Sequence, residues 1–374
     1  MKQGWEIKIF EDCIVKVRST TKIPKKKFLN DGAYPIISQE DEFINGYWDN
    51  EDDIFTVEKP LVIFGDHTKK VKYVDFNFVM GADGIKVLQP IDDINARFFF
   101  YQIQSLTIED LGYARHFRLL KKQYLFIPLL EEQKRIVAKL DKCFEAIDKA
   151  RTNVQKNLQN AKELFQSQLN QIFSQKGDGW EEKKLIDVNK FIDYRGRTPE
   201  KVSKGIRLIT AKNVKMGYLK REPEEFINPD DYESWMTRGI PRKNDVLFTT
   251  EAPLANVALL DTDEKIALAQ RIITFSPVRE TLTGEYLHYC LQSKESQEKI
   301  LAQATGATVS GIKSKLLKEI TIYIPSLDIQ ENIKEKLDVL KSQTQSLESN
   351  YQQELDALDE LKKSILQKAF NGEL

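Results

Sequence analysis

The sequence predicts a mixed α/β (α+β) protein in which two small, strand-rich domains alternate with two long helices. The first observation is an internal repeat, because Ile127–Asp141 and Ile324–Asp338 match at a constant offset of 197 residues. The second is that each copy continues into a long helical pattern, and the third is that the segments between them alternate like strands. A repeat of this kind divides the chain into two parallel halves.

Each repeated segment is predicted to form one long helix. No proline or glycine occurs between Glu131 and Gln175 or between Asp328 and Phe370. At 1.5 Å per residue each helix could reach roughly 65 Å, and a one-sided apolar stripe of that length needs a partner helix. We expect the two helices to pack on each other as a coiled coil; the alternative is that each packs on its own globular domain. The residues predicted to pair are Val137, Leu140, Phe144, Ile147, Val154, Leu158 and Phe165 in the first helix and Ile333, Leu337, Leu340, Leu347, Tyr351, Leu358 and Ile365 in the second.

The segment before the first long helix is predicted to be a small domain of strands and one helix. Runs rich in Val, Ile, Phe and Tyr, broken by Asp, Asn, Gly and Pro, are typical of strands joined by turns. Such runs occupy 33–38, 60–67, 71–80, 84–90 and 123–128, with an amphipathic helix expected over 95–111.

The second globular segment repeats this plan. Its opening, GWEEKKLIDV from Gly179, echoes GWEIKIFEDC from Gly4, and its strands are expected over 206–214, 244–253, 256–262, 271–277 and 319–325, with one helix over 284–303. The resulting boundaries are 1–127 and 177–324 for the two domains and 128–176 and 325–374 for the two helices.

Composition indicates an ordinary water-soluble protein. The net charge of −1 argues against a uniformly basic nucleic-acid binder, although lysines and arginines cluster locally. Three widely spaced cysteines suggest neither a disulfide framework nor a zinc site, and no apolar run approaches the ~20 residues that span a bilayer. We therefore expect a cytoplasmic protein that does not enter a membrane.

Signatures of catalysis are missing from the sequence. There is no GxxxxGK[ST] or GxGxxG loop for a nucleotide, and the three histidines stand without a nucleophile or acid at a recognisable spacing. The stretch Asn228–Asp231 begins with Asn-Pro but lacks the second proline and the aromatic residue that DNA amino-methylating enzymes use, so it is interpreted as a turn. We expect no catalytic residue, no metal site and no cofactor on this chain.

Several loops carry side chains suited to DNA. In Phe64–Lys70 a strand ends in glycine and polar donors followed by two lysines, which could meet base edges and phosphates; a tight turn capped by Asp66 and Thr68 is the alternative. Arg195 and Arg197 could each form two hydrogen bonds with a guanine, contact a phosphate, or only keep the surface soluble. The candidate DNA-contacting residues are Lys25, Lys26, Lys27, His67, Thr68, Lys69, Lys70, Arg115, His116 and Arg118 in the first half and Arg195, Arg197, Thr198, Lys212, Thr249, Thr250, Arg271, Thr308, Ser310 and Lys313 in the second.

The GWE openings, the helix start IPLLEEQKRIVAKLD and the ending ELKKSILQKAFNGEL resemble the specificity subunit of type I restriction-modification systems. The resemblance covers essentially the whole chain and implies two target-recognition domains, each reading one half of a split site in double-stranded DNA. It implies that the long helices pair antiparallel and set the gap, and that methyltransferase subunits, with S-adenosylmethionine bound to them, assemble on this frame. A restriction subunit that translocates DNA is a further partner in the family.

Two interpretations of different kinds follow. The first is a non-catalytic DNA reader and assembly scaffold, with half-sites separated by one duplex turn, roughly 34 Å. The alternative is a coiled-coil scaffold whose two globular heads bind protein partners, and a third is an enzyme with an unrecognised site.

Overall fold

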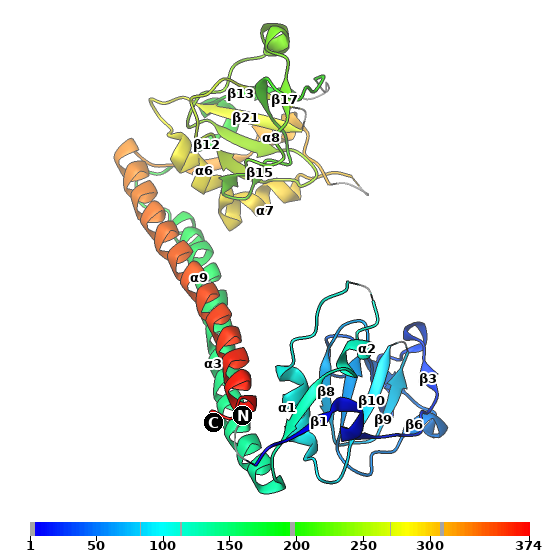
Figure 1. Ribbon diagram of the computed structural model, residues 1–374. Helices are drawn as coiled ribbons and strands as arrows, with labels where there is room; N and C mark the ends of the chain where they lie inside the picture. The colour runs from blue at the N-terminus through cyan, green and yellow to red at the C-terminus, as the bar shows by residue number, and fades with distance from the viewer. Residues whose placement is uncertain (1–3, 83, 113, 195–198, 270, 307–309) are drawn as a thin grey trace. The chain divides into compact units, whose positions relative to one another are not determined.

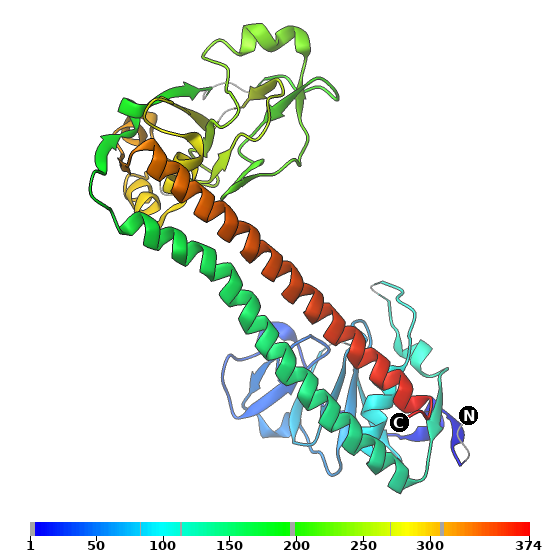
Figure 2. The ribbon, with the colours of Figure 1, turned by 90° about the vertical axis from the view of Figure 1, so that its left-hand side faces the viewer.

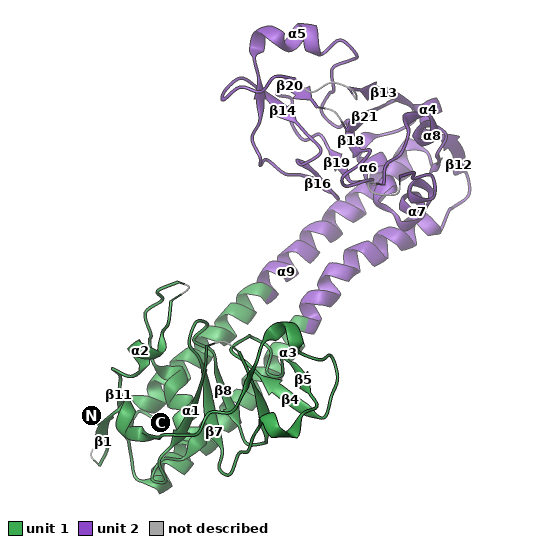
Figure 3. Ribbon diagram, turned by 90° about the vertical axis from the view of Figure 1, so that its right-hand side faces the viewer, with its two compact units in different colours: residues 1–155, 352–374 green, residues 156–351 purple. Residues whose placement is uncertain are grey.

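The computed structural model describes residues 4–82, 84–112, 114–194, 199–269, 271–306 and 310–374, and it divides into two compact units. Unit 1 comprises 1–155 and 352–374, and unit 2 comprises 156–351 (Figure 3). Each unit therefore contains one β-rich domain together with one part of each long helix.

The described residues of unit 1 form three sheets. A four-stranded sheet has the order β2-β10-β7-β8, a second has the order β3-β9-β4-β5 with β6 also paired to β9, and β1 pairs with β11. The strands are β1 Glu6–Ile9, β2 Ile14–Val15, β3 Lys22–Ile23, β4 Tyr34–Ile37, β5 Gly46–Trp48, β6 Ile54–Phe55, β7 Leu61–Gly65, β8 Val71–Val74, β9 Phe78–Gly81, β10 Ile85–Pro90 and β11 Tyr124–Ile127. The strands expected within 33–38, 60–67, 84–90 and 123–128 are present. The run 71–80, expected as one strand, forms β8 and β9 in different sheets, because residues 75–77 interrupt it with a bend.

Helix α1 (Ala96–Ser105) packs its apolar face on the first of these sheets (Figure 1). Asn95 caps it by accepting hydrogen bonds from the backbone N–H groups of Arg97 and Phe98, each at 3.0 Å. Its buried face, which includes Phe98 and Phe99, joins a core that also contains residues of both long helices. A short helix, α2 (Phe117–Leu120), follows before β11.

Unit 2 repeats this frame with different insertions. Its sheets have the orders β13-β21-β18-β19, β17-β14-β20, β12-β22 and β15-β16. The strands are β12 Glu181–Lys184, β13 Asn189–Asp193, β14 Ile206–Ile209, β15 Val214–Lys215, β16 Tyr218–Leu219, β17 Phe226–Ile227, β18 Val246–Thr249, β19 Val257–Leu259, β20 Ile266–Leu268, β21 Ile272–Pro277 and β22 Thr321–Ile324, and the shorter helices are α4 Leu185–Val188, α5 Tyr232–Trp235, α6 Gly284–Gln292, α7 Lys294–Ala302 and α8 Ser314–Lys318.

The single helix expected over 284–303 is two helices. Ser293 between α6 and α7 has extended backbone angles (φ −64°, ψ 149°) and caps α7 by accepting a hydrogen bond from the backbone N–H of Ser296. Serine at a helix N-terminus replaces lost backbone hydrogen bonds with its own hydroxyl, so the amphipathic pattern can continue while the chain turns.

The two repeated segments form the long helices α3 (Leu130–Ser174) and α9 (Leu327–Phe370), which run antiparallel (Figure 2). In unit 1 the first part of α3 meets the last part of α9, where Arg151 pairs with Asp359 and Lys362 lies 3.4 Å from Asp148. In unit 2 the last part of α3 and the first part of α9 share one core. Among the described residues no helix combines the length and apolarity needed to cross a membrane.

The same docking contacts occur in both units. Tyr101 of α1 donates a hydrogen bond to Asp141 of α3, and Tyr289 of α6 donates one to Asp338 of α9 at 2.5 Å. Asp141 and Asp338 are 197 residues apart, so they are equivalent in the repeat. Each domain helix therefore attaches to the long helix that follows it in the chain.

A second repeated contact joins each domain helix to the other long helix. Phe98 of α1 packs against Phe370 of α9 with ring centroids 5.2 Å apart, and Tyr286 of α6 packs against Phe173 of α3 at 5.4 Å. Phe173 and Phe370 are again 197 residues apart. The helices thus pack both on each other and on the domains, which combines the two alternatives that the sequence left open.

The apolar seam differs in part from the predicted one. Among the predicted residues Leu140, Phe144, Ile147, Val154, Ile333 and Leu337 are buried, and Val137, Leu158, Phe165, Leu340, Tyr351, Leu358 and Ile365 are half-buried. Leu347 is 38% exposed, whereas Leu355 and Leu366 are buried. A straight helix drifts from a strict seven-residue pattern, so the seam of α9 moves by one residue over its length.

The buried His288 of α6 makes the stability of unit 2 depend on pH. Burial lowers its pKa to about 3, and the charge of Lys341 acts in the same direction. The unfolded chain takes up this proton below about pH 6.5 while the folded chain does not, so stability falls as the pH falls from about 6.5 towards 3. We expect unit 2 to lose about 2 kcal/mol from this residue between about pH 6.5 and pH 5. Hydrogen exchange of unit 2, followed by mass spectrometry in the wild type and in His288→Gln at both pH values, measures it. Equal losses in the two proteins would contradict the assignment.

Candidate nucleic-acid interface

The turn between β7 and β8 presents four of the candidate residues. The turn is closed by the backbone N–H of Gly65, which donates to the carbonyl of Lys70 at 2.8 Å, and Lys69 adopts a left-handed backbone (φ 58°). Thr68 is exposed, and its hydroxyl donates to the carbonyl of Gln39 at 2.6 Å. His67 is half-buried, and its backbone N–H donates to the side chain of Gln39. The turn thus packs on a neighbouring loop and keeps Thr68 and Lys70 at the surface.

Asp66 links this turn to the second candidate loop of unit 1. Its carboxylate is buried and accepts a hydrogen bond from the backbone N–H of Phe117 at 2.8 Å, while its carbonyl accepts one from that of His116 at 2.7 Å. Lys86 lies 3.7 Å from the same carboxylate. The structure therefore brings 66–70 together with 115–118, two segments that the sequence separates by about fifty residues.

His116, a candidate DNA contact, lies inside this junction and not at the surface. The ring is fully buried: Nε2 accepts from the backbone N–H of Leu111 at 3.1 Å, and Nδ1 lies 3.1 Å from the carbonyl of Asp66. These partners fit a neutral ring with its proton on Nδ1. His116 thus holds the loop together, while its neighbours Arg115 and Arg118 are exposed.

The lysines of unit 1 are held by acidic partners from two loops. Lys69 pairs with Asp110 at 2.9 Å, Lys70 with Asp41, and Lys25 with Glu40 at 3.3 Å. Lys26 and Lys27 are exposed beside Lys25 in the short 3-10 helix Lys25–Lys27. Exposed ion pairs of this kind contribute about 0–1 kcal/mol, so these lysines can exchange a carboxylate for a phosphate.

In unit 2 the candidate residues meet where β18 and β21 adjoin the loop before α8. Thr250 exchanges backbone hydrogen bonds with two segments, since its N–H donates to the carbonyl of Arg271 and its carbonyl accepts from Ile312, both at 3.0 Å. Thr249 and Thr250 are buried, and Thr249 Oγ1 accepts from the backbone N–H of Asn256 at 2.9 Å. These buried threonines hold the segments of the junction together by hydrogen bonds.

Arg271 belongs to that junction, and the other charged candidates of unit 2 that the structure describes are exposed. Arg271 is exposed, has a left-handed backbone (φ 72°) and pairs with Glu251 at 2.8 Å. Ser310 and Lys313 are exposed on the loop before α8, and Lys212 is exposed beyond the end of β14, the parallel neighbour of β20. The candidates Arg195, Arg197, Thr198 and Thr308 lie outside the described residues.

Residues that the sequence did not single out complete both junctions. Gln39, Asp41 and Asp110 hold the lysines and the turn of unit 1, and Glu251 holds Arg271 in unit 2. Asp66 was considered only as a local cap, but it caps Phe117, which is 51 positions away. Within the part of the chain that the structure describes, no group of His, Cys, Asp and Glu is placed to hold a metal ion, and Asn228 caps a turn by accepting from the backbone N–H of Asp230.

Comparison with known proteins points to the same architecture, in which two β-rich domains alternate with two antiparallel helices. The family described as "Type I restriction modification DNA specificity domain" matches residues 2–157 and 177–357. The chain belongs to this family. It is a type I specificity subunit, the DNA-specificity component of a restriction-modification complex and not a catalytic one.

The specificity subunit is similar to curated relatives over much of its length. It is 24% identical to the Type I restriction enzyme EcoR124I/EcoR124II specificity subunit of Escherichia coli, over 92% of this chain and 88% of that one. It is 23% identical to the EcoBI specificity subunit of the same species, over 76% and 66%. Among solved structures, a chain from a study of complex assembly and conformational transition in a type I R-M system has a TM-score of 0.76 at 18% identity, covering 100% of this chain and 99% of that one. The HsdS subunit from Thermoanaerobacter tengcongensis has a TM-score of 0.59 at 19% identity, covering 100% and 98%. These two structures share the fold.

Proposed function

We propose that the specificity subunit reads a split target in double-stranded DNA, with one half-site contacted by each β-rich domain. Residues 1–127 and 177–324 are the two target-recognition domains, and the helical segments 128–176 and 325–374 set the length of the unread gap. Methyltransferase subunits, which bind S-adenosylmethionine, and a restriction subunit assemble with this chain; the chain contributes recognition and the partners contribute chemistry.

The observation that carries the proposal is the repeated frame with unlike loops. The docking contacts Tyr101–Asp141 and Tyr289–Asp338 are the same in both units, whereas the candidate loops differ in sequence and in hydrogen bonding. Arg271 and Lys69 occupy left-handed backbone positions beside these loops. Such positions are energetically unfavourable for residues other than glycine and cluster at functional sites. A constant frame with variable loops fits two reading heads of different specificity.

Replacing Asp66 with alanine tests the assignment of one domain to one half-site. The change removes the carboxylate that accepts from the backbone N–H of Phe117, which should cost unit 1 about 1–3 kcal/mol. It loosens 115–118 on the β7–β8 turn, where the backbone hydrogen bond from His116 to the carbonyl of residue 66 remains. In the assembled methyltransferase complex we expect discrimination at one half-site to be lost while the other half-site is still required. Binding to pools in which one half-site at a time is randomised measures this outcome.

Asp245→Ala is the matched control. Asp245 is also a buried carboxylate; it accepts hydrogen bonds from the backbone N–H of Arg242 and from Ser276, and it precedes β18 at the end opposite Thr249. We expect this variant to lose stability in unit 2 and still to recognise the same bases in both half-sites. Loss of both half-sites in Asp66→Ala, or of neither, would contradict the proposal.

A further inference from the structure

Unit 1 contains an open groove beside its candidate loops. The groove has a volume of about 720 Å³ and lies between the β7–β8 turn, the end of α1 with the residues that follow it, and the last part of α9. Its apolar lining residues are Phe64, Val71, Ile103, Leu106, Ile108 and Leu366. Lys69, Lys70, Lys362 and Lys363 also line it, together with the carboxylate of Asp359. The ion-pair partners of these lysines, Asp110, Asp41, Asp148 and Glu360, lie outside the lining.

In unit 2 the corresponding place is filled by helix α7. The backbone N–H of Lys294 donates to Asn170 of α3 at 2.9 Å, and Gln297 donates to the carbonyl of Ala255 in the β18–β19 connection at 3.1 Å. Ile300 of α7 is fully buried in the same core as Leu169 of α3, which is the repeat equivalent of Leu366. Helix α7 thus covers the side of the unit 2 core that corresponds to the groove of unit 1.

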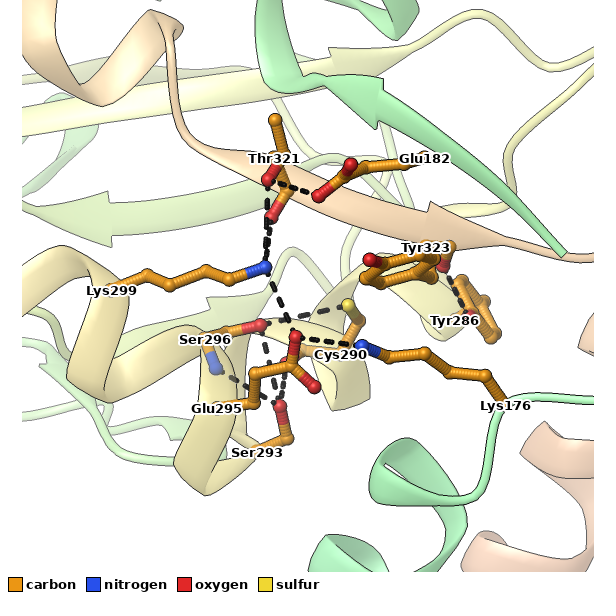
Figure 4. A network of polar contacts seen from close by, with 10 residues as sticks. All are labelled: Lys176, Glu182, Tyr286, Cys290, Ser293, Glu295, Ser296, Lys299, Thr321 and Tyr323. Atoms are coloured by element: carbon orange, nitrogen blue, oxygen red, sulfur yellow. Dashed lines mark hydrogen bonds and ion pairs between the residues drawn. The ribbon is translucent and has the colours of Figure 1, made fainter.

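Polar contacts hold α7 in its place. Figure 4 shows Glu295 of α7 between Lys176, at 3.1 Å, and Lys299, at 3.0 Å. Lys299 also donates to the carbonyl of Thr321 in β22 at 3.2 Å, and Lys176 lies 3.6 Å from the centroid of the Tyr323 ring. The helix is therefore attached to the end of α3 and to β22 as an integral part of unit 2.

Unit 1 has too short a chain segment to supply such a helix. Eighteen residues separate α1 from β11, against 28 between α6 and β22, and α7 accounts for nine of that difference. Between α1 and α2 the described residues 106–112 and 114–116 contain no helix. The groove is thus the place where unit 1 lacks a helix among its described residues. Of its apolar lining, Val71, Leu106 and Ile108 are half-buried, while Phe64, Ile103 and Leu366 are buried beneath them.

The charge around the groove distinguishes it from its counterpart. At the repeat positions of Lys362 and Lys363, unit 2 has Phe165 and Gln166, so the lysines belong to unit 1 alone. Lys363 pairs with the exposed Glu360 of its own helix, at 2.8 Å, and such pairs are weak enough to exchange. An occupant with carboxylates facing the lysines and apolar side chains facing the floor would match both features. A phosphate backbone would match the lysines and leave the apolar lining uncovered.

We propose that the groove docks one amphipathic helix, supplied by another protein subunit of the complex. Its apolar side chains lie on the floor of the groove, and its acidic side chains face the lysines. The helix takes the place that α7 takes in unit 2. Because unit 2 fills its own site, the chain offers one such site although its frame is repeated. The proposal rests on the proposed function only in that the partner is a subunit of the same complex.

A peptide probe tests this docking site on the full-length chain. The probe is a fluorescently labelled, hydrocarbon-stapled peptide with the sequence of α7 and glutamate in place of Lys294 and Lys299; the staple is needed because so short a helix is marginal in water. We expect saturable binding with one peptide per chain, measured by fluorescence anisotropy and mass spectrometry. Lys363→Glu and Ile108→Asp should each weaken binding at least about tenfold. Addition of the methyltransferase subunit should displace the peptide.

Two matched variants serve as controls. Lys336→Glu changes an exposed lysine of the same helix in unit 2, and Leu301→Asp changes an exposed leucine of α7; both should bind the probe like the wild type. Absence of binding, two peptides per chain, or equal affinity in Lys363→Glu would overturn the proposal. So would weaker DNA binding by Lys363→Glu with unchanged peptide affinity, which would mark the lysines as phosphate contacts. Peptide binding does not require DNA, so its failure would leave the half-site experiments unaffected.

Discussion

Replacing Phe98 with alanine is expected to lower the free energy of unfolding of unit 1 by about 3 to 5 kcal/mol, because it empties a fully buried aromatic site. The ring packs against Phe370 of α9, in a core that also includes Leu140 of α3. The loss should therefore spread to the ends of both long helices in unit 1. Hydrogen exchange measured by mass spectrometry resolves the two units, which a single unfolding curve of a two-unit chain cannot.

Phe43→Ala is the control for this prediction. Phe43 belongs to the same unit and has an aromatic neighbour, Phe76, at 6.1 Å, but its side chain is 43% exposed. A surface truncation of this kind usually changes stability by less than about 1 kcal/mol. If both variants lost the same protection, or if Phe98→Ala left α9 unaffected, the packing of α1 on α9 would not be what stabilises unit 1.

Lengthening both long helices by one heptad is expected to reduce affinity for the natural target by about three orders of magnitude, the range that separates specific from non-specific binding. The insertions go between Gln155 and Lys156 in α3 and between Tyr351 and Gln352 in α9, where each helix passes from one unit to the other. Seven residues add about 10 Å of helix, close to three base pairs of duplex. A target whose gap is longer by about three base pairs should restore binding.

The control inserts the heptad in α3 alone, which breaks the antiparallel register without lengthening the pair. We expect that variant to bind no target with a lengthened gap. The bases read in each half-site should stay the same in the double insertion, because the candidate loops are unchanged. The helices would not set the spacing if the double insertion changed the bases recognised in a half-site, or if it still preferred the natural gap.

The repeat made much of the frame predictable from sequence. Its offset of 197 residues placed both long helices and paired equivalent residues such as Asp141 with Asp338. Strand positions followed from alternating apolar residues and turn residues, which are local signals. The break at Ser293 was missed because both helices share one amphipathic pattern, and the seam at Leu355 was missed because a seven-residue template does not follow the drift of a straight helix.

The candidate site was less predictable, because tertiary contacts decide it. Residue chemistry pointed to the β7–β8 turn and to Arg271 as candidates, but it could not show that His116 is buried against Asp66. Nor could it find Asp41, Gln39 or Asp110, which lie in loops without a distinguishing pattern and meet the lysines only in the folded domain. Whether these loops read bases is the proposal that the half-site experiments test.

Selection of DNA from a random pool tests the central claim most directly. The chain assembled with its methyltransferase subunits is incubated with random duplexes, and the retained fraction is sequenced. We expect two short motifs separated by a fixed unread gap, with half-site centres about one duplex turn, roughly 34 Å, apart. A single contiguous motif, or a retained pool without any enriched sequence, would contradict the account of two reading domains on a repeated helical frame.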